Sequence, residues 1–464
     1  MAGISSPGVG SGLDVNSIVT QLMTLEQRPI GTLNTKEAGF QAKLTAYGSL
    51  KGAFSAVQSA AKALTVATTF TSRTVAVSDP TILSAAADTT ATAGSYAVEV
   101  TQLAKYHAVR SNTAYAATTE TLNTGTLAIK VGVGATVNVT IDSSNNTLAG
   151  IRQAINDANA GVTATIVNTG TTNRLVLTSN TLGSAGTVDV AVTEDGIGGP
   201  YDHALTDLKS TGLGTILVET QAADDAQFKI NNIAINRSSN TVGDAIGGVT
   251  LNLTKLGTTS VAISKNTGAT ATAINAFVKA YNDAVKQLQS VSTYDAANKR
   301  ASVLTGDGTA RSIGTELRTL VQTAVSGISG GIATLSDIGI ALQKDGTLVV
   351  DSAKLNTALT DPAKDVASLF SSTTTGNTGI AVRFYDALDG IVGSSGLIAS
   401  RTTGIAASIK DIGKQRDTLQ LRLVQIEKRY RAQFSALDSL VASMNKTSQF
   451  LTQQLANLPS ASGR

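Results

Sequence analysis

Residues 405–458 read IAASIKDIGKQRDTLQLRLVQIEKRYRAQFSALDSLVASMNKTSQFLTQQLANL and place a large side chain at alternating steps of four and three. Most positions of this series are apolar, and no proline interrupts it. An apolar spacing of 3.5 residues over about seven heptads predicts a coiled-coil helix. At 1.5 Å per residue the helix would be roughly 80 Å long. The series is Ile405, Ile409, Ile412, Arg416, Leu419, Leu423, Ile426, Tyr430, Gln433, Leu437, Leu440, Met444, Thr447, Leu451, Gln454 and Leu458.

Such a helix is not stable alone. Burial of its apolar side chains contributes at most ~36 kcal/mol, at about 1.5–3 kcal/mol for each side chain. Ordering roughly fifty residues costs more than that, at about 1–2 kcal/mol for each backbone unit. The apolar seam therefore requires a partner helix.

The other end of the chain supplies a candidate partner. Residues 13–28, LDVNSIVTQLMTLEQR, predict a short helix with Asp14 as its N-cap, and Pro29 interrupts it after Arg28. Its apolar stripe consists of Leu13, Val15, Ile18, Val19, Leu22 and Leu25. A second amphipathic pattern runs from Ile30 to Leu64. We therefore expect the two chain ends to meet as a helical stalk.

The middle of the chain has a different period. From about residue 71 to residue 264, apolar and polar residues alternate, which indicates half-buried strands. Residues 148–160 predict a short helix ended by Gly161, and Asn231-Asn232 predicts a tight turn. Helices return at residues 273–288 and 310–325, followed by a hairpin through Asp345-Gly346 and a short helix starting at Pro362.

These patterns predict an α+β multidomain fold, a terminal α-helical coiled-coil stalk with nested β-rich insertion domains. Residues 1–40 and 430–464 would form terminal leg helices that are disordered in the free subunit. Residues 41–72 and 266–429 would form the helical stalk domain with a small hairpin. Residues 73–115 and 224–265 would form a β-rich head domain, and residues 116–223 a second β-rich head domain inserted into it.

Composition excludes several classes of site. The chain has no cysteine and two histidines, so disulfides, thiolate chemistry and multi-histidine metal sites are not expected. The net charge of +3 is a small difference between Lys plus Arg and Asp plus Glu, which does not favour nucleic-acid binding. The sequence has no basic start followed by an apolar segment, so it does not predict a cleaved signal. It has no run of 18 apolar residues, so it does not predict membrane insertion either.

The sequence contains no convincing catalytic or cofactor motif. Neither GVGSG at residues 8–12 nor VGVGAT near residue 131 completes a phosphate-binding glycine pattern. His107 and His203 lack the context of a catalytic triad, and Asp224-Asp225 is typical of a solvated turn. A basic run indicates either an anionic partner surface or a solvated face beside the seam. This run consists of Lys410, Lys414, Arg416, Arg422, Lys428, Arg429 and Arg431.

Several segments, in order, resemble the flagellar filament cap protein family, also called flagellar hook-associated protein 2. GSGLDVNSIVTQLM at residues 10–23 resembles its N-terminus, and residues 226–257, with RSSNT and GVTLNL, resemble its middle signature. Residues 273–285, 306–313 and 338–355 match in order, and residues 428–455 fit its closing helix. Residues 148–184 resemble a small repeat found in cap proteins and some flagellins, whereas residues 179–223 resemble no segment of the family.

The resemblance implies a structural protein that is exported unfolded to the tip of the bacterial flagellum. It implies a ring of five copies that holds exported flagellin while it folds and inserts. Hook–filament junction proteins and an export chaperone would be further partners, and no cofactor or metal is expected. Residues assigned to leg packing and to the filament or self-assembly interface are Leu13, Ile18, Leu22, Leu419, Leu423, Ile426, Leu437, Leu440 and Leu451.

Three other functions remain open from the sequence. A flagellin or a hook–filament junction subunit would share paired terminal helices around β insertions. A surface adhesin would bind host mucin or other glycans through the β domains, which is compatible with capping. An enzyme is the least favoured, because the chain lacks a recognisable constellation of catalytic residues.

Overall fold

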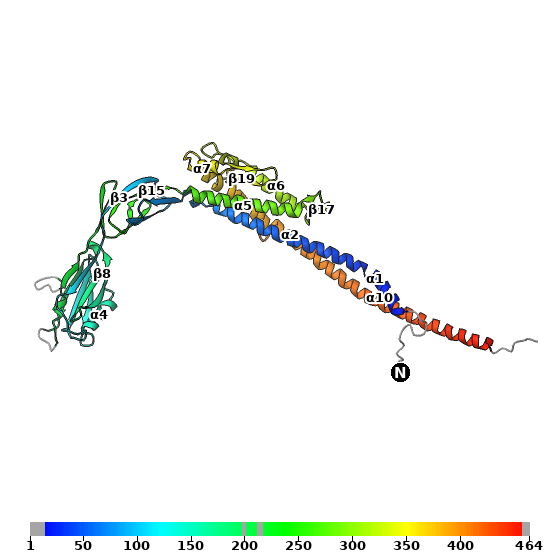
Figure 1. The fold of residues 1–464 in the computed structure, drawn as a ribbon, viewed down its shortest axis with the longest axis horizontal. Coiled ribbons are helices and arrows are strands. Elements are labelled where there is room, and N and C mark those ends of the chain that lie inside the picture. Colours follow the sequence, from blue (N-terminus) through cyan, green and yellow to red (C-terminus); the bar gives the residue numbers. More distant parts are fainter. Residues whose placement is uncertain (1–13, 197–200, 211–216, 457–464) are drawn as a thin grey trace, which may run out of the picture. The chain divides into compact units, whose positions relative to one another are not determined.

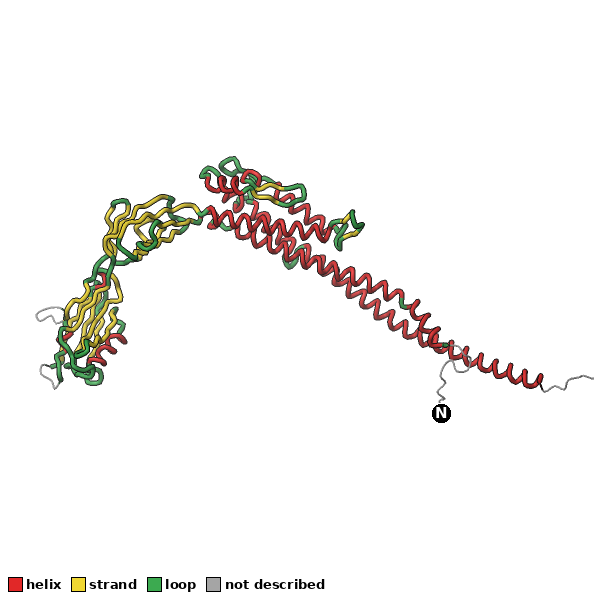
Figure 2. Tube along the Cα trace, viewed as in Figure 1, coloured by secondary structure: helices red, strands yellow, loops and turns green. Residues whose placement is uncertain are grey.

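The computed structural model describes residues 14–196, 201–210 and 217–456. The chain divides into two compact units. Unit 1 combines Met1–Thr69 with Thr267–Arg464, and unit 2 is Phe70–Asn266. Figure 1 shows helices from the beginning and the end of the sequence side by side in unit 1, and Figure 2 shows that unit 2 is built mainly of strands. The predicted α+β fold class, with a helical stalk formed by the chain ends, is therefore confirmed.

Unit 1 is predominantly helical. Its main helices are α1 (Val15–Glu26), α2 (Arg28–Thr65), α5 (Thr267–Ser292), α6 (Gly308–Gln322), α7 (Ser352–Thr360), α8 (Val366–Ser371), α9 (Ile380–Val392) and α10 (Leu397–Ala456). Two small hairpins accompany them, β16 (Tyr294–Asp295) with β17 (Arg300–Ala301) and β18 (Ile340–Leu342) with β19 (Leu348–Val350). None of the helices among the described residues is long and apolar enough to span a bilayer.

Helix α2 is the centre of unit 1 because its second half is surrounded by other helices. It packs against α5, α9 and α10, and its buried residues recur three and four positions apart. Aromatic rings complete this core, with Phe277 of α5 and Phe384 of α9 meeting edge to face at 5.1 Å between centroids. The buried residues of α2 are Leu33, Ala46, Tyr47, Leu50, Phe54, Val57, Ala61 and Leu64.

Towards its N-terminus, α2 leaves this bundle and pairs with α10 as a two-stranded coiled coil. Ile405 and Ile412 of the seam are buried, whereas most residues on either side of the seam are exposed. The break before α2 lies where proline predicted it, because α1 ends at Glu26 and Pro29 lies in the first turn of α2. The sequence period therefore predicted the pairing of the two ends.

The described residues of unit 2 form four sheets. The five-stranded sheet has the order β1-β15-β3-β11-β12, and a three-stranded sheet of order β13-β14-β2 packs with it around one core. A four-stranded sheet, β10-β4-β8-β7, and a three-stranded sheet, β6-β5-β9, share a second core with helix α4 (Leu148–Asp157). The short helix α3 (Thr68–Thr71) lies where the chain passes from unit 1 into unit 2.

The strands of the first core come from both sides of the inserted segment. They are β1 (Arg73–Val77), β2 (Leu83–Ala87), β3 (Gly94–Gln102), β11 (Ala226–Ile230), β12 (Ile233–Arg237), β13 (Thr241–Ile246), β14 (Val249–Leu253) and β15 (Gly257–Lys265). The second core uses β4 (Tyr106–Ser111), β5 (Gly125–Val131), β6 (Val137–Ile141), β7 (Val162–Asn168), β8 (Asn173–Leu182), β9 (Val188–Glu194) and β10 (Leu217–Gln221).

Local turn chemistry explains one hairpin and corrects two expectations. Asn231 and Asn232 both have positive φ, 46° and 66°, which suits a tight turn between β11 and β12. The helix before Gly161 ends earlier than expected, because Asn159 already adopts φ 49°. The short helix predicted from Pro362 is also wrong: α8 begins at Val366, where Asp365 accepts a hydrogen bond from the Ser368 N–H.

Candidate assembly interface

Helix α1 has two apolar faces that the sequence pattern merges into one stripe. Asp14 caps the helix by accepting a hydrogen bond from the Ser17 N–H at 3.0 Å. Val15, Val19 and Met23 are buried against Ile426 of α10, with Leu423, Tyr430 and Phe434 packed around them. Ile18 and Leu22 are half-buried, and Leu25 is 52% exposed. The inner face therefore holds α1 to α10, while the outer face is largely open.

Polar contacts flank the inner face and fix α1 along α10. The Tyr430 hydroxyl donates to Glu26 Oε1 at 3.1 Å, near the end of α1. At the other end of α1, Arg431 donates to Asn16 Oδ1 at 3.0 Å and also bonds Glu427 of its own helix. The contacts of Arg431 are exposed and that of Tyr430 is only partly buried, so we assign them to alignment rather than to stability.

The last turns of α10 extend beyond this cluster and present an uncovered apolar face. Leu440 is 57% exposed and Leu451 is 54% exposed, and Leu437 is also exposed. Within the described part of the chain, the cluster around α1 reaches only as far as Phe434. Because the seam repeat continues through these positions, α10 carries an apolar face here that the described residues of unit 1 do not cover.

The nine residues assigned to the interface from the sequence therefore have different environments. Ile426 is buried, and Leu423 packs beside it. Leu419, Ile18 and Leu22 are half-buried, and Leu437, Leu440 and Leu451 are exposed. Leu13 lies outside the described residues.

A charged pair lies within the coiled-coil seam at a position where the repeat places Arg416. Its guanidinium bonds Glu37 of α2 at 2.5 Å, and both side chains are about one-third exposed. In a coiled coil, a single polar pair at a seam position fixes the register of the two helices at some cost in stability. The sequence identified Arg416 as a seam position but did not identify its partner.

Asp307 joins three helices at the upper end of the stalk and was missed by the sequence analysis. Its carboxylate caps α6 by accepting from the Thr309 N–H at 2.9 Å, and it also accepts from the buried Tyr47 hydroxyl of α2 at 2.7 Å. The guanidinium of Arg401 in α10 also pairs with this carboxylate, with 3.0 Å between Arg401 Nη2 and Asp307 Oδ2. Burial acts to raise the pKa of Asp307, but hydrogen bonds from Tyr47 and Arg401 hold it below its ordinary value. The local signal was the cap residue in GDGTARSI.

The basic run of α10 is partly neutralised by neighbouring carboxylates, mostly of its own helix. Besides the pair between Arg416 and Glu37, Lys414 lies 3.5 Å from Asp411 and Arg431 lies 2.8 Å from Glu427. The arrangement fits the solvated face expected beside a coiled-coil seam more closely than a dedicated anion surface.

Both histidines contact neighbouring groups of unit 2. His107 is buried, and its Nδ1 accepts a hydrogen bond from the Val188 N–H at 2.9 Å, which links β4 to β9. His203 lies 3.0 Å from Glu120. Across the described residues, no group of three or more His, Cys, Asp and Glu side chains is placed to hold a metal ion.

Comparison with known proteins agrees with this architecture. Family models described as flagellar hook-associated protein 2 N-terminus and C-terminus match residues 11–107 and 223–446, and the flagellin hook IN motif matches residues 126–181. The chain is 33% identical to the B-type flagellar hook-associated protein 2 of Pseudomonas aeruginosa, over 100% of both chains. It is 34% identical to flagellar hook-associated protein 2 of Escherichia coli K12, over 98% of this chain and 99% of that one.

A solved structure is also similar. The D1-D2-D3 domains of the flagellar cap protein FliD from Escherichia coli superpose with a TM-score of 0.64 at 32% identity. The match covers 78% of this chain and 99% of the solved chain.

Proposed function

Because the chain belongs to the flagellar hook-associated protein 2 family, whose members cap the flagellar filament, we propose that its terminal helices anchor the cap. Capping at the tip of the flagellum, an extracellular appendage, is the function of this chain. The family is structural, and we propose no catalytic role. The relatives give the adhesin interpretation no support, and the family assignment replaces the flagellin and junction-subunit alternatives.

The uncovered face of α10 carries the proposal about anchoring. Five large side chains are exposed there, Leu437, Leu440, Met444, Leu451 and Leu455. Covering each would contribute about 1.5–3 kcal/mol, so docking of the whole face is worth on the order of 10 kcal/mol before entropy costs. An unpacked helical segment of this length is marginal in water, so this end of α10 gains order when it docks.

The partner of this face is the end of the filament, built of flagellin. Several copies of the chain form a ring there, and the resemblance suggests five. The two β-rich cores of unit 2 would form the plate under which exported flagellin folds. Export of the unfolded chain, an export chaperone and contacts with junction proteins are further parts of this proposal.

A matched pair of double variants tests the anchoring role. Leu440→Ala with Leu451→Ala truncates the apolar face, whereas Gln449→Ala with Gln453→Ala truncates the opposite, polar face of the same turns. All four residues are exposed, and alanine favours helix, so neither pair is expected to lower the melting temperature. Each is expressed in a strain lacking the natural gene.

Filament length and flagellin released into the medium are then measured. We expect the leucine pair to give short or missing filaments and abundant free flagellin, and the glutamine pair to behave like the unmodified chain. Normal filaments with the leucine pair would contradict the anchoring proposal. Normal filaments in the strain without any copy would contradict capping itself.

A further inference from the structure

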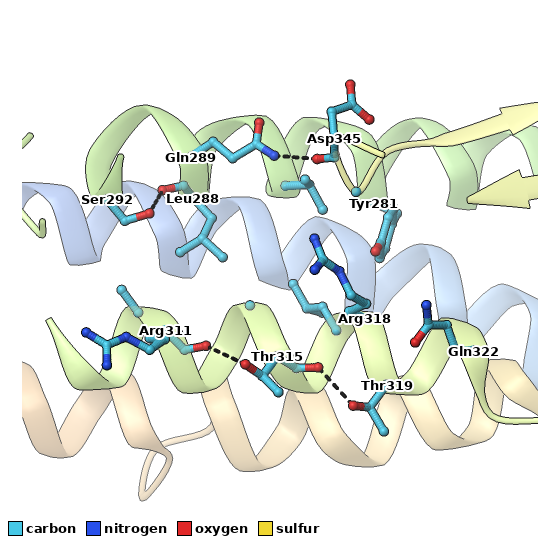
Figure 3. Close-up of a pocket in the computed structure, with 15 residues that line it drawn as sticks. Tyr281, Leu288, Gln289, Ser292, Arg311, Thr315, Arg318, Thr319, Gln322 and Asp345 are labelled. Carbon is cyan, nitrogen blue, oxygen red and sulfur yellow. Dashed lines mark hydrogen bonds between the residues drawn. The ribbon is translucent and has the colours of Figure 1, made fainter. Parts of the chain in front are cut away.

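A cavity of about 450 Å³ lies in unit 1 between α5, α6 and the hairpin of β18 and β19. Figure 3 shows α5 and α6 as its two walls, with the hairpin turn above. Val285, Leu288 and Leu317 supply apolar surface, while Arg311, Arg318 and Gln322 supply polar groups. Gly346, with φ +84°, turns the hairpin beside Arg318, where an added Cβ would lie 3.4 Å from the guanidinium. Nothing in the interface described above uses this cavity.

The hydroxyl of Tyr281 lies at the wall of this cavity and is not fully buried. Its side chain is 2% exposed and points between the two helices in Figure 3, and its hydroxyl has no hydrogen bond to any described residue. Tyr47, at equal depth in the same unit, donates to Asp307. The hydroxyl of Tyr281 is therefore free to bond a group that enters the cavity.

Two arginines of α6 add uncompensated positive charge. Arg311 and Arg318 are two turns apart, and within the described chain neither lies within ion-pair distance of a carboxylate. Asp345 does not neutralise them, because its carboxylate accepts from the N–H and hydroxyl of Thr347 and points out of the cavity in Figure 3. Burial raises the pKa of Tyr281 to about 12, opposed by the nearby Arg318 charge, so the hydroxyl keeps its proton at neutral pH.

We propose that this cavity binds a carboxylate side chain on an acidic peptide segment of another protein chain. Arg318 and Tyr281 would donate to the two carboxylate oxygens, a planar arrangement that suits guanidinium and hydroxyl donors. The apolar surface of Val285, Leu288 and Leu317 would pack against the aliphatic neighbours of the acidic residue. A free small anion would leave that surface uncovered, which favours a peptide.

Fluorescence anisotropy of the full-length chain with two labelled peptides tests this site. The acidic probe is acetyl-ALEALEALE-amide, and its neutral control is acetyl-ALQALQALQ-amide. We expect the acidic probe to bind at least about tenfold more tightly than the neutral one, because hydrogen bonds to charged groups are the strong ones. Arg318→Gln should remove most of this difference, and Tyr281→Phe should lower the affinity about threefold or more.

The matched control is Arg422→Gln, an exposed arginine of α10 outside the cavity lining. It should leave binding unchanged, and circular dichroism melting should be the same for all variants. Equal losses at Arg318 and Arg422 would show unspecific charge attraction and overturn the proposal. No binding to the unmodified chain, or equal binding of both peptides, would overturn it as well. These outcomes do not depend on filament growth, so they are separate from the test of anchoring.

Discussion

Replacing Asp307 by alanine should loosen α6 more than loss of an ordinary helix cap. Asp307 accepts hydrogen bonds from the Thr309 N–H at the start of α6 and from Tyr47 of α2, and it pairs with Arg401 of α10. Its own side chain is only 4% exposed. The variant therefore removes a cap and also leaves a buried hydroxyl without an acceptor.

The expected cost can be assembled from these parts. Loss of an N-cap costs about 0.5–2 kcal/mol. An unsatisfied buried hydroxyl at Tyr47 adds about 1–3 kcal/mol. Arg401 is 45% exposed, so its freed charge returns to water at little cost. The free energy of opening α6 should fall by roughly 1.5–5 kcal/mol in total.

Asp351→Ala is the matched control, because Asp351 caps α7 through the Ala353 and Lys354 N–H groups without a buried side-chain donor. Amide hydrogen exchange of the full chain, followed by mass spectrometry, reports on residues 308–322 and 352–360. Exchange in α6 of the Asp307 variant should accelerate at least about tenfold more than exchange in α7 of the control. Adding Tyr47→Phe to Asp307→Ala should recover part of the loss, because the orphaned hydroxyl is removed.

The same network gives a pH dependence with a defined sign. The pKa of Asp307 in the folded chain lies below its ordinary value of 3.8. Its contribution is therefore complete above that ordinary value and is lost as the pH falls through the lower folded value. Equal acceleration in α6 and α7, or the same acid response in the Asp307 variant and the unmodified chain, would refute this reasoning.

Three further predictions concern packing, register and turn geometry. Val19→Ala, at a buried position against Ile426, should weaken α1 docking by about 1–3 kcal/mol and hasten proteolysis within residues 14–28, while the exposed Leu25→Ala should not. Glu37→Arg should lower the melting temperature of the stalk, measured by calorimetry, because it places two like charges side by side. Adding Arg416→Glu should restore the melting temperature, and a failure to recover would contradict a role of this pair in fixing the register. Asn232→Val should destabilise unit 2 by about 1–2 kcal/mol in urea unfolding because φ is 66° there, whereas Asn232→Gly should be neutral or stabilising.

Long-period features of the chain could be predicted because they repeat. The seam of α10 and the stripe of α2 each repeat over many turns, so a single misplaced residue does not obscure the pattern. The break at Pro29 and the turn at Asn231-Asn232 could also be predicted, since each depends on the backbone limits of one or two residues. Short elements were less secure: the local pattern placed a helix start at Pro362, but Asp365 caps α8.

The candidate sites could not be predicted in the same way, because they depend on contacts between elements rather than on a repeating pattern. Exposure of Leu437, Leu440 and Leu451 could not be inferred, because the same repeat continues from positions that α1 or α2 covers. The two faces of α1 could not be inferred either, because the sequence of a short helix with six apolar residues does not specify which of those residues contact α10. Tyr281 and Arg318 lie on separate helices, and neither residue type carries a motif.

The sequence alone determined that both ends of this chain are helical and pair with one another. Heptad spacing is a local property, and in a helix it places the apolar residues along one side, where they pack against a partner helix. Only the tertiary structure decided where that seam runs out of partners and which polar groups meet between helices. Asp307 is 260 residues from Tyr47 and 94 residues from Arg401 in the sequence. The three side chains meet only because α2, α6 and α10 are packed together. Contacts across such separations depend on the packing of whole elements, which no local pattern records.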